Sequence, residues 1–299
     1  MENKPTLTVF TPTYNRADLL NRGYEALKRQ TCKDFLWLII DDGSTDNTRE
    51  VVEGWMKQNN GFEIRYAYKE NGGLHTGYNK AIELMDTEIC VCIDSDDWMP
   101  DDAVEIICQE WQKYRDEDIA GIVGLDYRSD GGILGGHFPD GKKVHYIELK
   151  EDKRFNFDNK IVLRTDLLKM VAPQPSFPGE KNFNPIWMIL KVDQMKPYVL
   201  IDRCLCIVDY QGGGMSYNLI NQYFNSPNSF LELRKLYISL KYASWKYKLR
   251  NHIHLVAQSH VAHKNPFTVS NNILITVLVY PLGCLVYHYM KHIHKIFNR

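Results

Sequence analysis

The sequence predicts an α/β fold with helices on both faces of a doubly wound, mainly parallel sheet. Apolar strand-like runs and amphipathic helix-like segments alternate four times between residues 7 and 125, which is the order typical of such a sheet. Several apolar runs end abruptly in polar clusters, at the strand ends where sheets of this class bind ligands. The 299 residues, 44% of them hydrophobic, suffice for one large domain and an appendage.

The elements of the predicted sheet follow one another closely along the chain. Strands are expected at 7–10, 35–40, 63–68, 89–93 and 119–125, and helices at 18–29, 51–56, 74–85 and 101–114. The run at 35–40 is almost continuously apolar, as in a strand that is buried on both faces. Asp18 is the expected N-cap of the first helix.

The regular alternation is lost after residue 125. Paired glycines indicate turns up to about residue 160. The remaining elements are expected at 159–164, 198–201 and 205–210 for strands and at 184–192 for a helix. Gly212-Gly213-Gly214 then predicts a break before a helical remainder.

Three carboxylates, Asp94, Asp96 and Asp97, directly follow the apolar run at 89–93. Residues i and i+2 of a strand point to the same face, so Asp94 and Asp96 can converge on one point. Mg²⁺ and Mn²⁺ prefer oxygen ligands of this kind, with phosphate completing the shell. A helix N-cap with spare acids is the alternative, because a helical pattern begins just after Pro100.

Two further polar clusters end neighbouring strands of the predicted sheet. They occupy residues 11–16 and 41–46, and the carboxyl ends of parallel strands meet at one edge of a sheet. One such cluster is easily a helix cap, whereas three at successive strand ends favour a ligand site.

Four motifs in order then resemble the family 2 glycosyltransferases with the GT-A fold. They read TPTYNR, LWLIIDDGSTDNT, ENGGLHTGYNKAI and CIDSDD. The resemblance covers residues 5–125 well and continues more loosely to about 215, with the nearest likeness to bacterial enzymes that build cell-surface polysaccharide. It implies a nucleotide-sugar-binding half at 1–125 and an acceptor-binding half at 126–215. The charge distribution separately predicts a basic helical, membrane-associating tail at 216–299.

The resemblance also implies the reaction. A metal-dependent, inverting enzyme of the hexosyltransferase type would move a sugar from a UDP-sugar to a hydroxyl of a glycan or lipid-linked glycan. The expected cofactor is Mn²⁺ or Mg²⁺, which would neutralise charge on the departing UDP. A nucleotidyltransferase is the less favoured alternative, because residues 13–16 lack a glycine-rich, lysine-bearing loop. A non-catalytic nucleotide-sugar or glycan-binding protein is the alternative from another class.

The nucleotide contacts are likewise implied by the resemblance. Pro12 and Tyr14 would flank the base, and Asp42 would accept a hydrogen bond from the uracil N–H. The other implied nucleotide-sugar contacts are Asn71, Gly72, Gly73, Asn79, Lys80 and Asp94. For Lys80, a solvated helix lysine is an equally open reading.

The metal and the general base complete the implied site. Asp96 would bind the metal directly, Asp94 would face the ribose or a metal-bound water, and Asp97 would share the metal. A carboxylate must take the proton from the acceptor hydroxyl. Glu180 is the candidate, although Gly179-Glu180-Lys181 replaces the family's acidic pair and Glu180 also fits a helix first turn. Asp193 is the reserve.

The tail differs in charge from the rest of the chain. From Arg234 to Arg299 there are ten Lys or Arg and no Asp or Glu, so an anionic membrane surface is the expected partner. Nucleic acid is not expected, because no reading motif is present. One helix stripe is predicted from Leu233, Leu236, Leu240, Ala243 and Tyr247.

Residues 273–289 carry no charged side chain over 17 positions. That is short for a span, which needs about 20 residues, so a helix that spans, dips into or lies on the membrane is expected, with a buried core helix as the alternative. No signal peptide is expected, and the cysteines in apolar runs indicate buried thiols of a reducing compartment. The predicted location is cytoplasmic, peripheral on the inner face of the cell membrane.

Overall fold

The computed structural model describes residues 4–209 and 219–297, which form parts of two compact units. The sheet unit comprises Met1–Gln174 and Met188–Gln211, and the helical unit comprises Pro175–Trp187 and Gly212–Arg299. The predicted break at Gly212–Gly214 and the predicted boundary at 215/216 lie outside the described residues. The short stretch Pro175–Trp187 joins the helical unit although the surrounding chain belongs to the sheet.

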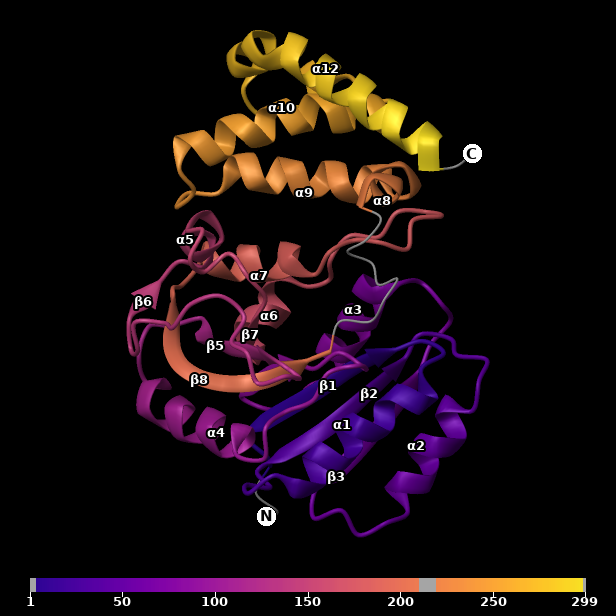
Figure 1. Cartoon of the computed structure of the whole chain (residues 1–299), viewed down its shortest axis with the longest axis vertical. Helices are drawn as coiled ribbons and strands as arrows, with labels where there is room; N and C mark the ends of the chain where they lie inside the picture. The colour runs from indigo at the N-terminus through magenta and orange to yellow at the C-terminus, as the bar shows by residue number, and fades with distance from the viewer. Residues whose placement is uncertain (1–3, 210–218, 298–299) are drawn as a thin grey trace. The chain divides into compact units, whose positions relative to one another are not determined.

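The sheet unit contains an eight-stranded mixed sheet (Figure 1). Its strands are β1 (Leu7–Thr13), β2 (Phe35–Asp41), β3 (Glu63–Tyr68), β4 (Ile89–Cys92), β5 (Gly121–Arg128), β6 (Lys143–Val144), β7 (Asn159–Arg164) and β8 (Tyr198–Val208). Their order across the sheet is β3-β2-β1-β4-β7-β5-β8-β6. β1 to β4 are mutually parallel, whereas β7 runs antiparallel between β4 and β5. The predicted doubly wound α/β class is confirmed, and the two strands predicted at 198–201 and 205–210 are one continuous strand.

Helices cover both faces of this sheet. They are α1 (Ala17–Arg29), α2 (Thr48–Met56), α3 (Leu74–Leu84), α4 (Ala103–Tyr114), α5 (Tyr146–Glu151) and α6 (Thr165–Val171). One core joins the sheet to α1, α2 and α4 through side chains such as Val9, Trp37 and Trp55; α1 and α2 lie in front of the strands in Figure 1. On the opposite face Phe10 packs edge-on against Tyr78 of α3, with ring centroids 5.0 Å apart. Alternate residues of β1 therefore serve opposite layers, as strand geometry requires.

The N-terminus of α1 departs from the prediction. The N-cap is Arg16 rather than Asp18, and its carbonyl accepts hydrogen bonds from Leu19 and Leu20 at 3.1 and 3.2 Å. Asp18 lies in the first turn instead, where an acid is favoured by the helix dipole.

The helical unit is built from α8 (Leu219–Asn225), α9 (Pro227–Ser239), α10 (Trp245–Val261), α11 (Pro266–Val269) and α12 (Ile273–Phe297). α10 packs between α9 and α12. The single helix stripe predicted through Tyr247 is wrong, because α9 ends at Ser239 and α10 begins at Trp245. Leu240 and Ala243 are nevertheless buried, in the connection between the two helices. α7 (Ile186–Asp193) contains the boundary between the two units.

α12 is long and apolar enough, by length and composition, to cross a membrane, and most of that stretch is exposed. Its buried positions lie on one face, where Gly283 meets α10 so closely that a Cβ there would fall 2.4 Å from the Cβ of Val256. The opposite face exposes large apolar side chains, among them Leu274 (83%) and Leu278 (75%). α12 therefore uses one face for α10 and leaves an apolar stripe uncovered by the described residues.

Candidate functional site

The three polar clusters predicted at strand ends meet at one edge of the sheet. Parallel pairing of β1 with both β2 and β4 brings their carboxyl ends together. The side-chain oxygen of Asn15, after β1, accepts hydrogen bonds from the backbone of Thr45 and Asp46 at 2.7 and 3.3 Å. Arg16 contacts Asp96 in the third cluster. The prediction that the clusters lie close together is confirmed.

The first cluster combines a buried and an exposed residue. Pro12 is buried in β1 beside Ile40 of β2, and it lies close to Gly77 of α3. Tyr14 follows β1 and is 48% exposed. Tyr14 is thus accessible to a ligand at this edge, whereas Pro12 is part of the buried strand.

Asp42 organises the loop between β3 and α3. Its carboxylate accepts hydrogen bonds from the backbone N–H of Gly72 at 3.0 Å and of Gly73 at 2.8 Å, and it forms an ion pair with Lys69. Asn71 binds the Asp42 carbonyl oxygen at 2.8 Å. The structure therefore brings together the predicted nucleotide residues Asp42, Asn71, Gly72 and Gly73. The Asp42 carboxylate is bound by residues 69–73, the loop between β3 and α3.

Two glycines permit this loop arrangement. Gly73 is the N-cap of α3 with φ of 92°, and Gly43 has φ of 87°, both in the region that residues with a Cβ rarely adopt. A Cβ at Gly43 would lie 2.7 Å from the backbone nitrogen of Asn71. Asp41 braces the same turn, because its carboxylate accepts hydrogen bonds from the Ser44 N–H at 2.7 Å and the Tyr66 hydroxyl at 2.5 Å.

Asn79 and Lys80 on α3 have other partners. The Asn79 amide both donates to and accepts from the backbone of Gln174, at 2.9 and 2.8 Å, which ties α3 to the chain after α6. Lys80 forms a partly exposed i,i+3 ion pair with Glu83 at 3.1 Å. These contacts match structural and solvated roles, and the nucleotide roles of both residues stay predictions.

The acidic loop, Asp94–Asp97, is fixed to the sheet at both ends. The Ile93 N–H donates to the Phe10 carbonyl at 3.0 Å, and Trp98 exchanges backbone hydrogen bonds with Ile207 of β8 at 3.1 and 2.7 Å. The Asp209 N–H donates to the Asp97 carboxylate at 3.3 Å. Hydrogen bonds at both ends therefore fix this loop to the edge of the sheet.

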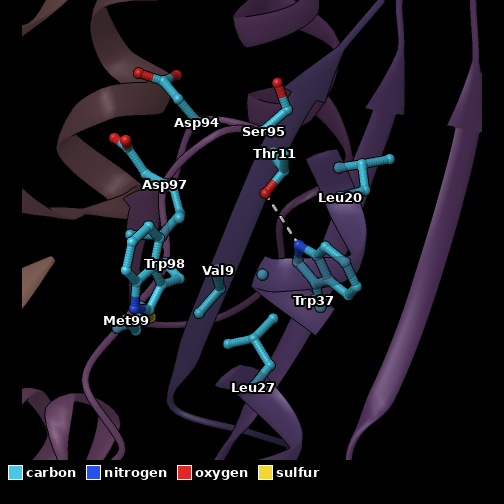
Figure 2. A pocket seen from close by; sticks show the side chains of 12 residues that line it. Val9, Thr11, Leu20, Leu27, Trp37, Asp94, Ser95, Asp97, Trp98 and Met99 are labelled. Carbon is cyan, nitrogen blue, oxygen red and sulfur yellow. Dashed lines mark hydrogen bonds between the residues drawn. The ribbon is translucent and has the colours of Figure 1, made fainter. Parts of the chain in front are cut away.

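A small pocket lies behind the acidic loop, between β1 and α1 (Figure 2). In Figure 2 Asp94, Asp97, Trp98 and Met99 follow one another along one side, and Leu20 and Trp37 lie across from them. Its remaining lining is mostly apolar, and the Trp37 ring N–H is satisfied by the Thr11 hydroxyl at 3.0 Å. The lining does not include Pro12, Tyr14 or Asp42, so this pocket backs the acidic loop and is separate from the predicted base site.

Asp96 is held by one side-chain cation. The Arg16 guanidinium donates to the Asp96 carboxylate at 2.9 Å, and the two side chains are 40% and 22% exposed. Asp94 beside it reaches solvent, and the Cys92 thiol lies 3.8 Å from its carboxylate. Desolvation by the surrounding residues raises the pKa of Asp94 even though its side chain reaches solvent; Lys160 lowers this pKa, and the charge of Asp96 raises it.

A second cation, Lys160 at the start of β7, lies beneath the loop. Its ammonium group is 3.9 Å from the carboxylates of both Asp97 and Asp126, and its side chain is only 11% exposed. Burial raises the pKa of Asp97 to about 7 and that of Asp126 to about 6, and Lys160 lowers both. These carboxylates outweigh the cost of burial for Lys160, whose pKa is raised well above its usual value.

Glu180, the predicted base, lies in the helical unit and caps α9. One carboxylate oxygen accepts from the backbone and side-chain N–H groups of Asn228 at 2.9 and 2.7 Å. The other accepts from the backbone N–H and hydroxyl of Ser229 at 2.8 and 2.7 Å. An ionised carboxylate offers about four lone-pair positions, so Glu180 has no position left for an acceptor proton in this conformation. The alternative reading as a helix first-turn acid does not hold, because Glu180 lies in a turn outside any helix and binds the N-terminus of α9 from outside that helix.

Asp193, the reserve, has a comparable position in the sheet unit. It is fully buried and accepts hydrogen bonds from the N–H groups of Tyr146 and Ile147 at the start of α5, at 2.6 and 3.4 Å. His145 contacts the same carboxylate at 3.2 Å. Burial raises the pKa of Asp193. Its contacts are those of a helix cap, and they leave it no access to a substrate.

Two charged residues of the site escaped sequence reasoning. Asp126 closes the apolar run of β5 just as Asp94 closes that of β4, so the strand-end rule applied to every strand would have found it. Lys160 directly precedes the apolar residues of strand β7, and a lysine buried in a strand is a sign of an ion pair. Neither residue belongs to a motif that stood out by itself.

The acidic loop fits a divalent cation that is completed by substrate. Within the described parts of the chain, no three His, Cys, Asp or Glu side chains form a ready metal cage. Mg²⁺ typically takes one or two carboxylates and substrate phosphates instead. Asp94 and Asp96 match that donor set, since they supply two carboxylates from one loop and both side chains reach solvent.

Known proteins share both sequence and fold with this chain. Chondroitin synthase of Pasteurella multocida is 30% identical over 130 residues, which are 44% of this chain but only 13% of the synthase. The chain thus corresponds to a small part of that relative. Among solved structures, residues 1–349 of S. aureus TarS in complex with UDP-GlcNAc align with a TM-score of 0.61 at 16% identity, over 92% of this chain and 79% of that one.

A second solved structure has the same fold. The mannosyltransferase PcManGT of Pyrobaculum calidifontis, in complex with GDP-Man and Mn²⁺, aligns with a TM-score of 0.55 at 16% identity, over 98% of this chain and 84% of that one. These likenesses show the GT-A type of fold. The model of the family described as glycosyl transferase family 2 matches residues 8–169, which is more than half of the chain. The chain therefore belongs to glycosyl transferase family 2.

Proposed function

We propose that the protein transfers a sugar, with inversion, from a UDP-sugar to a hydroxyl of a glycan or lipid-linked glycan in cell-surface polysaccharide synthesis. The observation that carries the proposal is the convergence of the three polar strand ends, with Tyr14, the Asp42 loop and the acidic loop at one sheet edge. The relative named as a chondroitin synthase and the structural neighbour with bound UDP-GlcNAc support a polysaccharide product and a UDP-sugar donor.

In this proposal the residues divide between donor and metal. Tyr14 stacks on the base, and the Asp42 loop with Asn71, Gly72 and Gly73 borders it. Asp94 and Asp96 hold Mn²⁺ or Mg²⁺, which when bound neutralises the diphosphate of the leaving group. We assign Asp97 a supporting role, because it is buried and faces Lys160.

The experiment that tests the proposal is calorimetric titration of UDP in the presence of Mn²⁺. Asp96→Ala should remove Mn²⁺-dependent UDP binding and transfer, because a charged ligand is lost. Asp101→Ala, an exposed acid four residues after the acidic loop, is the matched control and should bind normally. Equal UDP affinity of Asp96→Ala and the wild type in Mn²⁺ would refute the metal assignment.

We further propose that α12 attaches the protein to the anionic inner face of the cell membrane. The support is the uncovered apolar stripe that contains Leu274, Leu278 and Leu282, in a region that has ten basic and no acidic residues from Arg234 onward. A helix that packs on α10 by one face and exposes an apolar stripe on the other suits a position in the interface. Basic residues near the surface add attraction to anionic lipid.

Sedimentation with liposomes tests the membrane proposal. Leu278→Glu combined with Leu282→Glu should release the protein from vesicles that contain anionic lipid, because two charges enter the apolar stripe. Leu84→Glu, an exposed leucine of the sheet unit, is the control and should still sediment. Undiminished sedimentation of the double variant would contradict attachment through α12.

A further inference from the structure

The ion pair between Arg16 and Asp96 puts a positive charge on the acid proposed to bind the metal. The distance is 2.9 Å from Arg16 Nη1 to Asp96 Oδ2. In the described part of the chain, Arg16 is the one side chain that hydrogen-bonds to Asp96. A divalent cation at that oxygen would be repelled by the guanidinium unless Arg16 moved away.

Arg16 is built so that its side chain can leave while its backbone stays. Its carbonyl oxygen accepts the first hydrogen bonds of α1, which fixes the backbone at the helix start. The Arg16 side chain is 40% exposed, so solvent screens its ion pair with Asp96. Release of Asp96 by Arg16 is therefore inexpensive.

Lys160 has the opposite character. It lies between the buried carboxylates of Asp97 and Asp126, at 3.9 Å from each. Its departure would leave two buried acids without a counter-ion, which is strongly unfavourable. Among the described residues, the acidic loop therefore meets one permanent cation, Lys160, and one replaceable cation, Arg16.

We propose that Arg16 is a positioning residue that holds Asp96 in the nucleotide-free enzyme and moves to the donor diphosphate when Asp96 binds the metal. The inference rests on the proposed metal-dependent use of a UDP-sugar. Guanidinium groups bind phosphate oxygens through two parallel hydrogen bonds, so the diphosphate offers Arg16 a better partner than one carboxylate oxygen.

This exchange makes metal and nucleotide binding depend on one another. Without nucleotide, Arg16 competes for Asp96 and the metal binds weakly. With the diphosphate present, Arg16 has another anion and Asp96 is free. Because coupling between two ligands is reciprocal, metal should strengthen nucleotide binding by the same factor.

The test measures Mn²⁺ binding by the full chain with and without UDP, from the electron paramagnetic resonance signal of free Mn²⁺. Arg16→Met should raise the Mn²⁺ affinity of the nucleotide-free protein about tenfold, because a nearby like charge is removed. The ratio between the affinities with and without UDP should fall by at least a similar factor. Arg16→Lys keeps the positive charge and should retain weak Mn²⁺ binding without UDP.

Arg29→Met is the matched control. Arg29 lies on the same helix and pairs with Asp101 at 3.0 Å, with both side chains more than half exposed, and its loss should leave both affinities unchanged. An unchanged or weaker nucleotide-free affinity in Arg16→Met, while the wild type binds Mn²⁺ with UDP, would overturn the inference alone. Absence of Mn²⁺ binding by the wild type even with UDP would overturn the proposed metal dependence and the inference together.

Discussion

Glu180 in the helical unit and Asp96 in the sheet unit are both hydrogen-bonded carboxylates, but their partners differ in kind. Glu180 accepts four hydrogen bonds, two of them from backbone N–H groups at the start of α9. Asp96 is contacted by one partly exposed arginine side chain. A backbone donor in a helix cannot leave unless the helix unwinds, whereas an arginine side chain can rotate away.

This difference indicates what distinguishes a structural acid from one prepared for a ligand. Burial and the number of bonds describe how firmly a carboxylate is held, but the mobility of its partners decides whether a ligand can replace them. Asp42 is intermediate, since it binds backbone N–H groups of Gly72 and Gly73 together with the Lys69 side chain.

Of the variants that test this comparison, Glu180→Gln should have the largest effect on stability. The amide places N–H groups against donors of Asn228 or Ser229, and loss of charge-assisted bonds should destabilise the start of α9 by about 3 kcal/mol or more. Hydrogen exchange of the α9 amides, measured by mass spectrometry, should accelerate accordingly. Glu232→Gln, which replaces a surface acid of α9 paired with Lys235, should not change that exchange.

The same variant separates the cap from the predicted base. A general base contributes roughly 10²-fold or more to the rate. Turnover reduced by that factor with unchanged α9 exchange would return the base role to Glu180 and show that its hydrogen bonds yield to substrate.

Asp126→Asn should have the second largest effect. It should change how the free energy of unfolding depends on pH, by up to about 3 kcal/mol. Burial raises the pKa of Asp126 to about 6 in the folded protein from a usual value of 3.8. The folded state therefore binds this proton more tightly than the unfolded state. Protonation of Asp126 contributes to stability at low pH, and this contribution is lost as pH rises from about 4 to about 6. Asparagine cannot titrate, so the variant should lack this fall.

Urea unfolding at a series of pH values from 4 to 7 measures the effect. Only the slope of unfolding free energy against pH carries the prediction, since any change of packing at this position shifts the values at all pH alike. Asp116→Asn, at an exposed position, should keep the wild-type slope. Parallel profiles for Asp126→Asn and the wild type would mean that the buried acid does not titrate in this range.

The smallest effect is expected from Lys80→Ala. An exposed i,i+3 ion pair with Glu83 contributes little, so UDP affinity should change by roughly twofold or less. Calorimetry with UDP and Mn²⁺ is the measurement. A tenfold weaker affinity would make Lys80 a nucleotide ligand and would place it with Asp96 rather than with the structural charges.

Much of the fold was predictable because local patterns decide it. The alternation of strands and helices through residue 125 and the meeting of the three strand-end clusters follow from periodicity and from parallel topology. The partners of individual acids were not predictable, because Glu180 and α9 lie 48 residues apart in sequence. The break between α9 and α10 was missed because Leu240 and Ala243 continue the apolar spacing although the chain leaves the helix there.

The direction of β7 has a consequence for how such sites acquire charges. Parallel strands can equip this edge of the sheet only with residues that follow them in the chain, and here the charged ones are mostly acids, with Arg16 after β1 and Lys69 after β3 among the exceptions. β7 runs the other way, so its first residues, Asn159 and Lys160, arrive at that same edge opposite Leu125 and Gly124. One reversed strand thus delivers a base from its beginning to acids delivered from the ends of its neighbours. A search for the charged residues of such a site should examine the first residues of antiparallel strands as well as the residues that follow parallel strands.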